Sequence, residues 1–535
     1  MVKNLLKFYG TSCSHLRHFV RRNDGNLSVA FALSLVPMIT AAGVAVDYSR
    51  MSGAKSALQA ALDAGVVAAA TENNGRTAAE LTQTVTTFVN SNKGRHEYKN
   101  LQLSVNAEND WTVTANASAC VDLMFSGFLG ASSFCFTGAA EAKRGKNHLE
   151  VVLVLDNTGS MDNATNRIGN LRAASKLLVD ILEKAATGNR TVKISLVPFV
   201  TEVNVKGEGF DMAWIDTTAA NPLHGSNFDP PVGSPPGTKV NHMALFGKMQ
   251  IPWKGCVEAR PAPYNLNDTA PSLANPSSLF VPAFAPDEPG TATPGGNSGS
   301  GYNNSYLSDA VAGTDTQKQR SIVKYDFALP RPVPIVEVAN STGGAQNLTN
   351  GPNRACPTPI VPLTNDYNKL RTNIAAMRHW NGSGTNVSEG LMWGWRVLSP
   401  EPPYTDGRPF SDPTVQKVIL LLTDGENVVY GASGTPNKSD YGSYGFLASG
   451  RFNALDQTAA ARNVDGWVRD TCTNLKAQGV MIYTITLEAN TAANTALYGP
   501  CASRPDMYFD SPNASQLSGI FGNIAQQLVA LKLTK

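Results

Sequence analysis

The chain of 535 residues lacks the sequence features of several common protein classes. Charged residues make up only 16% of it and the formal net charge is +2, so there is neither a basic surface for nucleic acid nor an acidic tail. No two cysteines form a CxxC pair and the seven histidines are dispersed, which argues against a zinc site. The GxSxG, HExxH and phosphate-binding GxxxxGKS/T motifs are also absent, so we expect no enzymatic activity.

One long apolar run is present near the N-terminus. No charged residue occurs from Leu27 to Val46, and as a helix this run would span about 30 Å, the thickness of a hydrocarbon core. Basic residues precede it and Asp47 follows it, so we expect residues 1–26 in the cytoplasm, a single transmembrane helix over 27–46 and the rest of the chain outside.

Two other interpretations of this run stay open. A cleaved secretory signal would use Gly43-Val44-Ala45 as its small-residue site, and a buried helix of a soluble protein would also be apolar. The run is longer than a usual signal core, and an Ala-rich helical pattern continues through it to Ala70. We therefore prefer a retained membrane anchor.

Residues 47–146 have the pattern of a small α+β region. Small and apolar residues recur at spacings of three and four after Asp47, which predicts a helix over 47–90. Alternating apolar residues at 101–105 and 112–117 surround an Asn-Asp turn signal and predict a hairpin. We expect the helix to lie against this antiparallel sheet.

Residues 147–535 alternate between short apolar runs and helical patterns. This order predicts an α/β fold with a doubly wound, mainly parallel sheet. An insertion at about 203–362, rich in Pro, Gly, Asn and Ser, interrupts the order, and we expect its aromatic residues to form a small satellite core. The predicted strands are Glu150–Asp156, Thr191–Phe199, Val415–Asp424, Val480–Leu487 and Met507–Asp510, and the aromatic residues are Trp214, Phe228, Phe246 and Trp253.

Six of the seven cysteines follow the apolar run. An even number beyond a membrane segment fits an oxidising compartment and three disulfides. Pairing in order gives the bonds Cys120–Cys135, Cys256–Cys356 and Cys472–Cys501, the second of which would close the base of the insertion. The other fourteen connectivities, and buried free thiols, stay open.

Oxygen-bearing side chains follow three elements of the predicted sheet domain. The first strand ends in Asp156-Asn157-Thr158-Gly159-Ser160, a later strand ends at Asp424, and Thr385 lies at the start of a helix. Carboxyl ends of parallel strands share one edge, so we expect these oxygens to meet there, although the same residue types also cap helices. Of the charged residues nearby, we expect Lys417 at the surface. Glu426 either supports the site, which we favour, or is merely solvated.

This pattern resembles the metal-ion-dependent adhesion site of von Willebrand A domains, with Thr158 in place of a serine. The resemblance implies that Thr158, Ser160 and Thr385 bind a cation through hydroxyls, and that Asp156 and Asp424 contact it directly or through water. Oxygen ligands favour Mg²⁺, with Mn²⁺ or Ca²⁺ possible. An open coordination position could then take an acidic residue of a partner protein.

Other segments resemble TadG-like proteins of the Flp (tight adherence) pilus-assembly system. The resemblance implies a bacterial inner-membrane protein with a periplasmic body that binds pilus or secretion components; the alternative is a surface-exposed adhesin that binds host or matrix proteins. Gly25–Phe31 is similar to a prepilin cleavage region, but Ala30 stands where pilins have glutamate, so we expect no processing. The segments are Arg22–Arg50, Trp253–Glu258, Gly390–Arg396, Cys501 and Tyr508–Asp510.

Overall fold

A computed structural model of the protein divides the chain into two compact units, Met1–Gly145 and Lys146–Thr534. The basic segment expected in the cytoplasm lies outside the described residues, apart from Asn26. The structure describes residues 26–72, 77–91, 98–109, 112–130, 132–143, 148–161, 165–186, 191–290, 301–329, 331, 335, 350–382 and 384–530.

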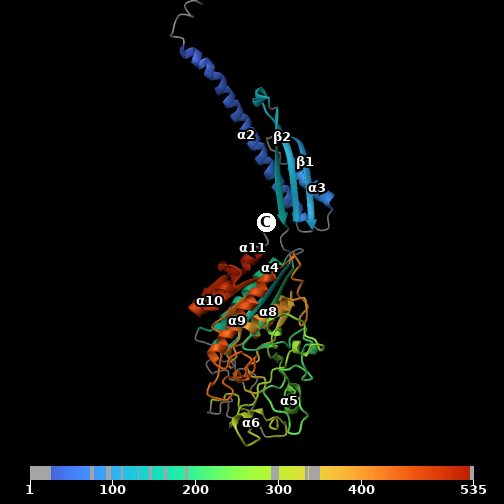
Figure 1. Ribbon diagram of the computed structural model, residues 1–535, viewed down its shortest axis with the longest axis vertical. Helices are drawn as coiled ribbons and strands as arrows, with labels where there is room; N and C mark the ends of the chain where they lie inside the picture. Colours follow the sequence, from blue (N-terminus) through green and yellow to red (C-terminus); the bar gives the residue numbers. More distant parts are fainter. Residues whose placement is uncertain are drawn as a thin grey trace, which may run out of the picture. The chain divides into compact units, whose positions relative to one another are not determined.

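The N-terminal unit consists of two helices packed on one face of a three-stranded antiparallel sheet (Figure 1). Alternate residues of the middle strand, from Val113 to Val121, are buried against Leu58, Leu62 and Val66 of the long helix. The strands lie in the order β1-β2-β3. The elements are α2 (Asn26–Glu72), α3 (Ala78–Ser91), β1 (Lys99–Asn109), β2 (Thr112–Asp122) and β3 (Ser133–Lys143).

Two features of this unit differ from the sequence prediction. The helix expected over 47–90 is divided, because α2 ends at Glu72 and Thr77 starts α3 with a capping box: the Thr77 N–H donates to Glu80 Oε2 over 2.8 Å. The predicted hairpin gains the third strand β3, which Cys135 joins to Cys120 of β2. The apolar part of α2 is the one helix among the described residues that is long and apolar enough to cross a membrane.

The larger unit is built on an eight-stranded sheet with the order β13-β12-β10-β4-β5-β6-β7, and β8 pairs with β5. The five strands from β13 to β5 are parallel, which confirms the predicted doubly wound α/β fold. These strands are β4 (His148–Asp156), β5 (Thr191–Phe199), β10 (Val415–Thr423), β12 (Met481–Leu487) and β13 (Tyr508–Ser511).

Helices cover both faces of this sheet. Leu149, Val151 and Leu153 of β4 pack toward one face, whereas Val152 and Val154 pack toward the other, as the two-residue period of a strand requires. The first face carries α4 (Arg167–Ala185), α7 (Tyr367–Ala376) and α11 (Leu517–Ala530), and the second carries α8 (Val387–Leu398), α9 (Gln457–Ala477) and α10 (Ala492–Cys501). The chain leaves β4 toward β5 on one side, and β10 lies on its other side, so a topological switch point separates β4 from β10.

The insertion does not form the satellite core expected from its sequence. Its aromatic residues belong to the core that covers one face of the sheet: the ring centroids of Trp214 and Tyr404 lie 5.1 Å apart, and those of Phe280 and Trp393 lie 4.7 Å apart. Trp393 belongs to α8, so the large aromatic rings of this helix extend the sheet core into the insertion. Short strands β6 (Val203–Asn204), β7 (Cys256–Val257) and β8 (Val361–Thr364) join it to the sheet edge.

The disulfides of this unit are Cys256–Cys356, which links two parts of the insertion, and Cys472–Cys501, which joins α9 to α10. Together with the bond between β2 and β3, they are the pairs given by the order of the cysteines. Lys417 is not at the surface, as the sequence suggested, because its ammonium is buried against Glu150 of the neighbouring strand.

A buried histidine in the insertion predicts acid sensitivity. Burial, followed by the nearby His224, lowers the pKa of His242 from 6.5 to about 4. The unfolded chain therefore binds a proton below pH 6.5 that the folded chain excludes until about pH 4, so this contribution to stability is complete above 6.5 and is lost as the pH falls toward 4. We expect His242→Gln to lose less stability than wild type between roughly pH 7 and pH 4.5 in urea unfolding. Equal losses in the two proteins would contradict this prediction.

Candidate metal centre

Two hydroxyl side chains, one from the loop after β4 and one from the end of β10, contact a single buried carboxylate. Asp156 is fully buried and accepts hydrogen bonds from the Thr158 N–H (2.8 Å) and the Thr158 hydroxyl (2.6 Å) on Oδ1. Oδ2 accepts a hydrogen bond of 2.8 Å from the Thr423 hydroxyl at the end of β10. These bonds fix the Asp156 carboxylate at the switch point between β4 and β10.

A continuous chain of polar contacts joins this carboxylate to the second one. The Thr158 and Ser160 hydroxyls lie 3.0 Å apart, and the Ser160 hydroxyl donates to Asp424 Oδ1 over 2.7 Å. Asp424 follows β10 directly, and the parallel register sets Leu422 beside Leu155, so both strands end at the same level. The structure thus brings together Asp156, Thr158, Ser160 and Asp424, four of the five predicted ligands.

Gly159 allows Asn381 to approach this loop closely. A Cβ atom at this position would lie 1.8 Å from Asn381 Oδ1, well inside contact distance. The close approach continues through the backbone, because the Trp380 N–H donates to the Asn157 carbonyl over 2.8 Å. The segment that leads to Thr385 therefore starts beside the loop that holds the first three candidate ligands.

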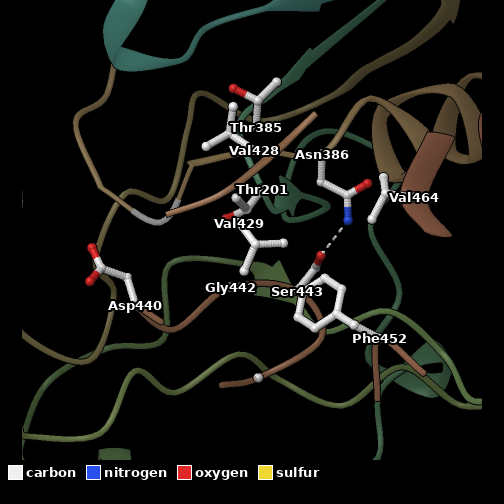
Figure 2. Close-up of a pocket in the computed structure, with 11 residues that line it drawn as sticks. Thr201, Thr385, Asn386, Val428, Val429, Asp440, Gly442, Ser443, Phe452 and Val464 are labelled. Atoms are coloured by element: carbon white, nitrogen blue, oxygen red, sulfur yellow. Dashed lines mark hydrogen bonds between the residues drawn. The ribbon is translucent and has the colours of Figure 1, made fainter. Parts of the chain in front are cut away.

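Thr385 itself faces different neighbours. Its backbone pairs with Val428, four residues beyond Asp424, and the next residue, Asn386, donates its N–H to the Val200 carbonyl just after β5. Figure 2 shows Thr385 beside Val428 at a small cavity of about 10 Å³, with Asn386 directed toward Ser443. Within the described part of the chain, no hydrogen bond joins the Thr385 hydroxyl to the other four candidate ligands. The structure places Thr385 at the correct edge of the sheet without linking it to them.

The two carboxylates carry more negative charge than their surroundings offset. Burial, and then the charge of Asp424, raises the pKa of Asp156 to about 7. Burial also raises the pKa of Asp424, opposed by the Ser160 hydroxyl and by Arg167, whose guanidinium lies 2.7 Å from Asp424 Oδ2. Arg167 also pairs with Glu488. A divalent cation would relieve the repulsion between the two buried carboxylates.

The donor set fits a hard cation. The candidate ligands are carboxylate and hydroxyl oxygens, the type that Mg²⁺ and Ca²⁺ prefer. The described residues contain no group of three or more His, Cys, Asp or Glu side chains that could hold a metal. A cation at this centre would therefore depend on the hydroxyls as much as on Asp156 and Asp424.

Sequence reasoning missed three residues around the site. Thr423 and Arg167 contact the two carboxylates directly, and Asn427 accepts the Val387 N–H at the start of α8 over 2.8 Å. Glu426 does not support the site as expected, because its side chain is exposed, and the structure instead buries Asn427. Thr423 directly precedes the predicted Asp424, and that adjacency was the available signal.

The sheet order and the oxygen-lined loop at its switch point define a von Willebrand A-type α/β domain. Residues 25–72 are similar to the family model described as putative Flp pilus-assembly TadE/G-like. The chain thus carries an N-terminal segment that is similar to this family and a larger unit with a von Willebrand A-type fold. No curated protein matches the chain.

Several solved structures are similar at a low level. The von Willebrand domain of the type V pilus tip protein Mfa5 from Porphyromonas gingivalis is 12% identical, with a TM-score of 0.32 over 73% of this chain and 97% of that chain. The pilus adhesin RrgA from Streptococcus pneumoniae is 12% identical, with a TM-score of 0.32 over 80% and 49%. The pilus adhesin SpaC from Lactobacillus rhamnosus GG is 11% identical, with a TM-score of 0.30. The match covers 80% of this chain and 34% of SpaC.

Proposed function

We propose that this pilus-related protein is a membrane-anchored, metal-dependent protein-binding module of Flp pilus assembly. In this proposal α2 holds the chain in the bacterial inner membrane, with the N-terminus in the cytoplasm and the folded units in the periplasm. The TadE/G-like match at residues 25–72 supports a role in pilus assembly, and the apolar first half of α2 supports the membrane anchor. The three disulfides support an oxidising compartment.

One observation carries the binding role: two buried carboxylates share a polar network with two hydroxyls at the switch point of the sheet. Asp156, Thr158, Ser160 and Asp424 would hold Mg²⁺, with Mn²⁺ or Ca²⁺ as alternatives, and Thr385 would complete the site from the adjacent loop. The bound cation would supply an electrophilic centre for a carboxylate of a pilus or secretion component. The residues around it would hold that centre at the open edge of the sheet.

Crosslinking in cells tests this function. We expect the full-length protein to capture pilus components, and expect the capture to be lost with Asp424→Ala and after removal of divalent cations. Glu426→Ala is the matched control, because it removes an exposed carboxylate from the same loop. The proposal fails if Asp424→Ala captures the same proteins as wild type, or if both variants lose them equally.

A substitution of Arg167 is expected to strengthen cation binding instead of weakening it. Its guanidinium already offsets the charge of Asp424 at 2.7 Å, so it repels an incoming cation. We expect Arg167→Gln to tighten Mg²⁺ binding by about five- to tenfold, measured by calorimetry on the full chain in nanodiscs. Lys176→Gln removes the same charge from the exposed side of α4 and should leave the affinity unchanged. Weaker binding by Arg167→Gln would mean that this side chain orders the site instead.

A further inference from the structure

The connection between β2 and β3 is fastened to the long helix by a single carboxylate. Asp47 is buried and accepts hydrogen bonds from the backbone N–H groups of Met124 (2.9 Å), Phe125 (2.9 Å) and Ser126 (2.7 Å), and from the Ser126 hydroxyl (2.9 Å). Three successive N–H groups directed at one anion form a rigid concave arrangement. Although burial raises the pKa of Asp47, these bonds lower it to about 2, so the carboxylate stays ionised.

A second contact lies one helical turn earlier. Gly43 is buried beneath Phe125, and a Cβ atom at position 43 would lie 2.6 Å from the Phe125 Cβ. Only glycine allows the loop this close to the helix. Gly43 and Asp47 are four residues apart, so they share one face of α2, and the loop is seated on that face.

The contact falls at the end of the uncharged segment. Asp47 is the first charged residue after the run 27–46, and Gly43 lies within the last turn of that run. Apolar side chains along the same run are exposed, among them Leu33 at 72% and Val36 at 69%. If this run spans the hydrocarbon core, the loop lies at the boundary between hydrocarbon and headgroups.

The loop is unusually apolar for an exposed connection. No charged residue occurs from Leu123 to Ala140. Met124 is 67% exposed, and Phe125 and Phe134 are each 44% exposed. Phe134 pairs with Val121, which faces the helices, so Phe134 lies on the same side of the sheet as α2. The exposure of such apolar side chains to water is unfavourable, whereas their insertion into a membrane surface is favourable.

We propose that the β2–β3 connection, with Met124, Phe125 and Phe134, is a second membrane contact that inserts into the interfacial region of the leaflet where the anchor helix ends. Lipid is the partner of this loop, because the exposed apolar surface of the anchor helix continues directly onto the loop. Two contacts separated along the sequence would fix the tilt and rotation of α2, which a single helix leaves free. The inference rests on the proposed membrane anchor.

Depth-dependent quenching in nanodiscs tests the contact. The full chain is prepared in a Cys13→Ser background, since the other six cysteines form disulfides, and single cysteines carry an environment-sensitive fluorophore. The labelled variants are Met124→Cys, Val44→Cys within the anchor, and Ser104→Cys on the exposed face of the sheet. We expect lipids spin-labelled near the headgroups to quench position 124 severalfold more than position 104.

Each result bears on a different claim. Quenching at 44 without quenching at 124 keeps the anchor and overturns the loop contact. An absence of quenching at 44 overturns the anchor, and the loop contact with it. If position 124 becomes less quenched by lipid as the number of protein copies per nanodisc rises, the surface contacts a second chain. This result would also overturn the inference. Asp47→Ala should reduce quenching at 124 severalfold while leaving position 44 unchanged, because it releases the loop alone.

Discussion

Asp156→Asn is expected to weaken Mg²⁺ binding by about 100-fold or more. The substitution keeps the size of the side chain but removes one of the two charges that hold the cation, and it places an amide where Oδ1 or Oδ2 accepts from Thr158 and Thr423. Calorimetry on the full chain in nanodiscs measures the loss directly. Saturating Mg²⁺ should raise the melting temperature of wild type, by mass action, and leave that of the variant unchanged.

The variant need not lose its fold. Burial and the charge of Asp424 already disfavour an ionised Asp156, so a neutral side chain removes that repulsion in the metal-free protein. Melting without added metal should therefore show a similar or higher temperature for Asp156→Asn. Glu426→Gln is the control for charge at this edge of the sheet. If Asp156→Asn binds Mg²⁺ as tightly as wild type, the predicted centre is wrong.

Lys417→Met is expected to destabilise the larger unit by about 3–5 kcal/mol, the largest stability effect we predict. Lys417 lies on β10 beside Glu150 of β4, their charged groups are 2.5 Å apart, and both side chains are nearly inaccessible to solvent. The ammonium also donates to the Leu398 carbonyl at the end of α8 over 2.7 Å. Removing Lys417 leaves a buried carboxylate whose other oxygen accepts from the Arg408 N–H, its one remaining partner among the described residues.

The double variant Glu150→Gln with Lys417→Met separates charge from packing. Most of the lost stability should return, because the glutamine of Glu150→Gln carries no charge and the double variant therefore has no unpaired buried charge. Urea unfolding of wild type, of each single variant and of the double variant gives the coupling energy between the two residues. A double variant as unstable as Lys417→Met would show that the side chain contributes through packing and not through the ion pair.

Elements whose signals are local could be predicted from the amino-acid sequence alone. Strands β4, β5 and β10 are continuous apolar runs because both of their faces are buried, and each run ends at the residue where the structure ends the strand or one residue beyond it. Asp156 and Asp424 follow from this, since a polar residue directly after a buried strand lies at the open edge of a sheet. The uncharged run 27–46 is likewise local, because twenty residues without charge are visible before any folding.

Contacts between residues far apart in the sequence could not be predicted in this way. Arg167 pairs with Asp424 across 257 positions of chain, and Lys417 pairs with Glu150 across 267, through the order and register of strands that no local pattern encodes. The same holds for the insertion, whose aromatic residues joined the sheet core because α8 presents Trp393 to them. The periodicity of apolar residues indicates which face of a helix or strand is buried. The residues that this face contacts depend on the packing of the whole chain.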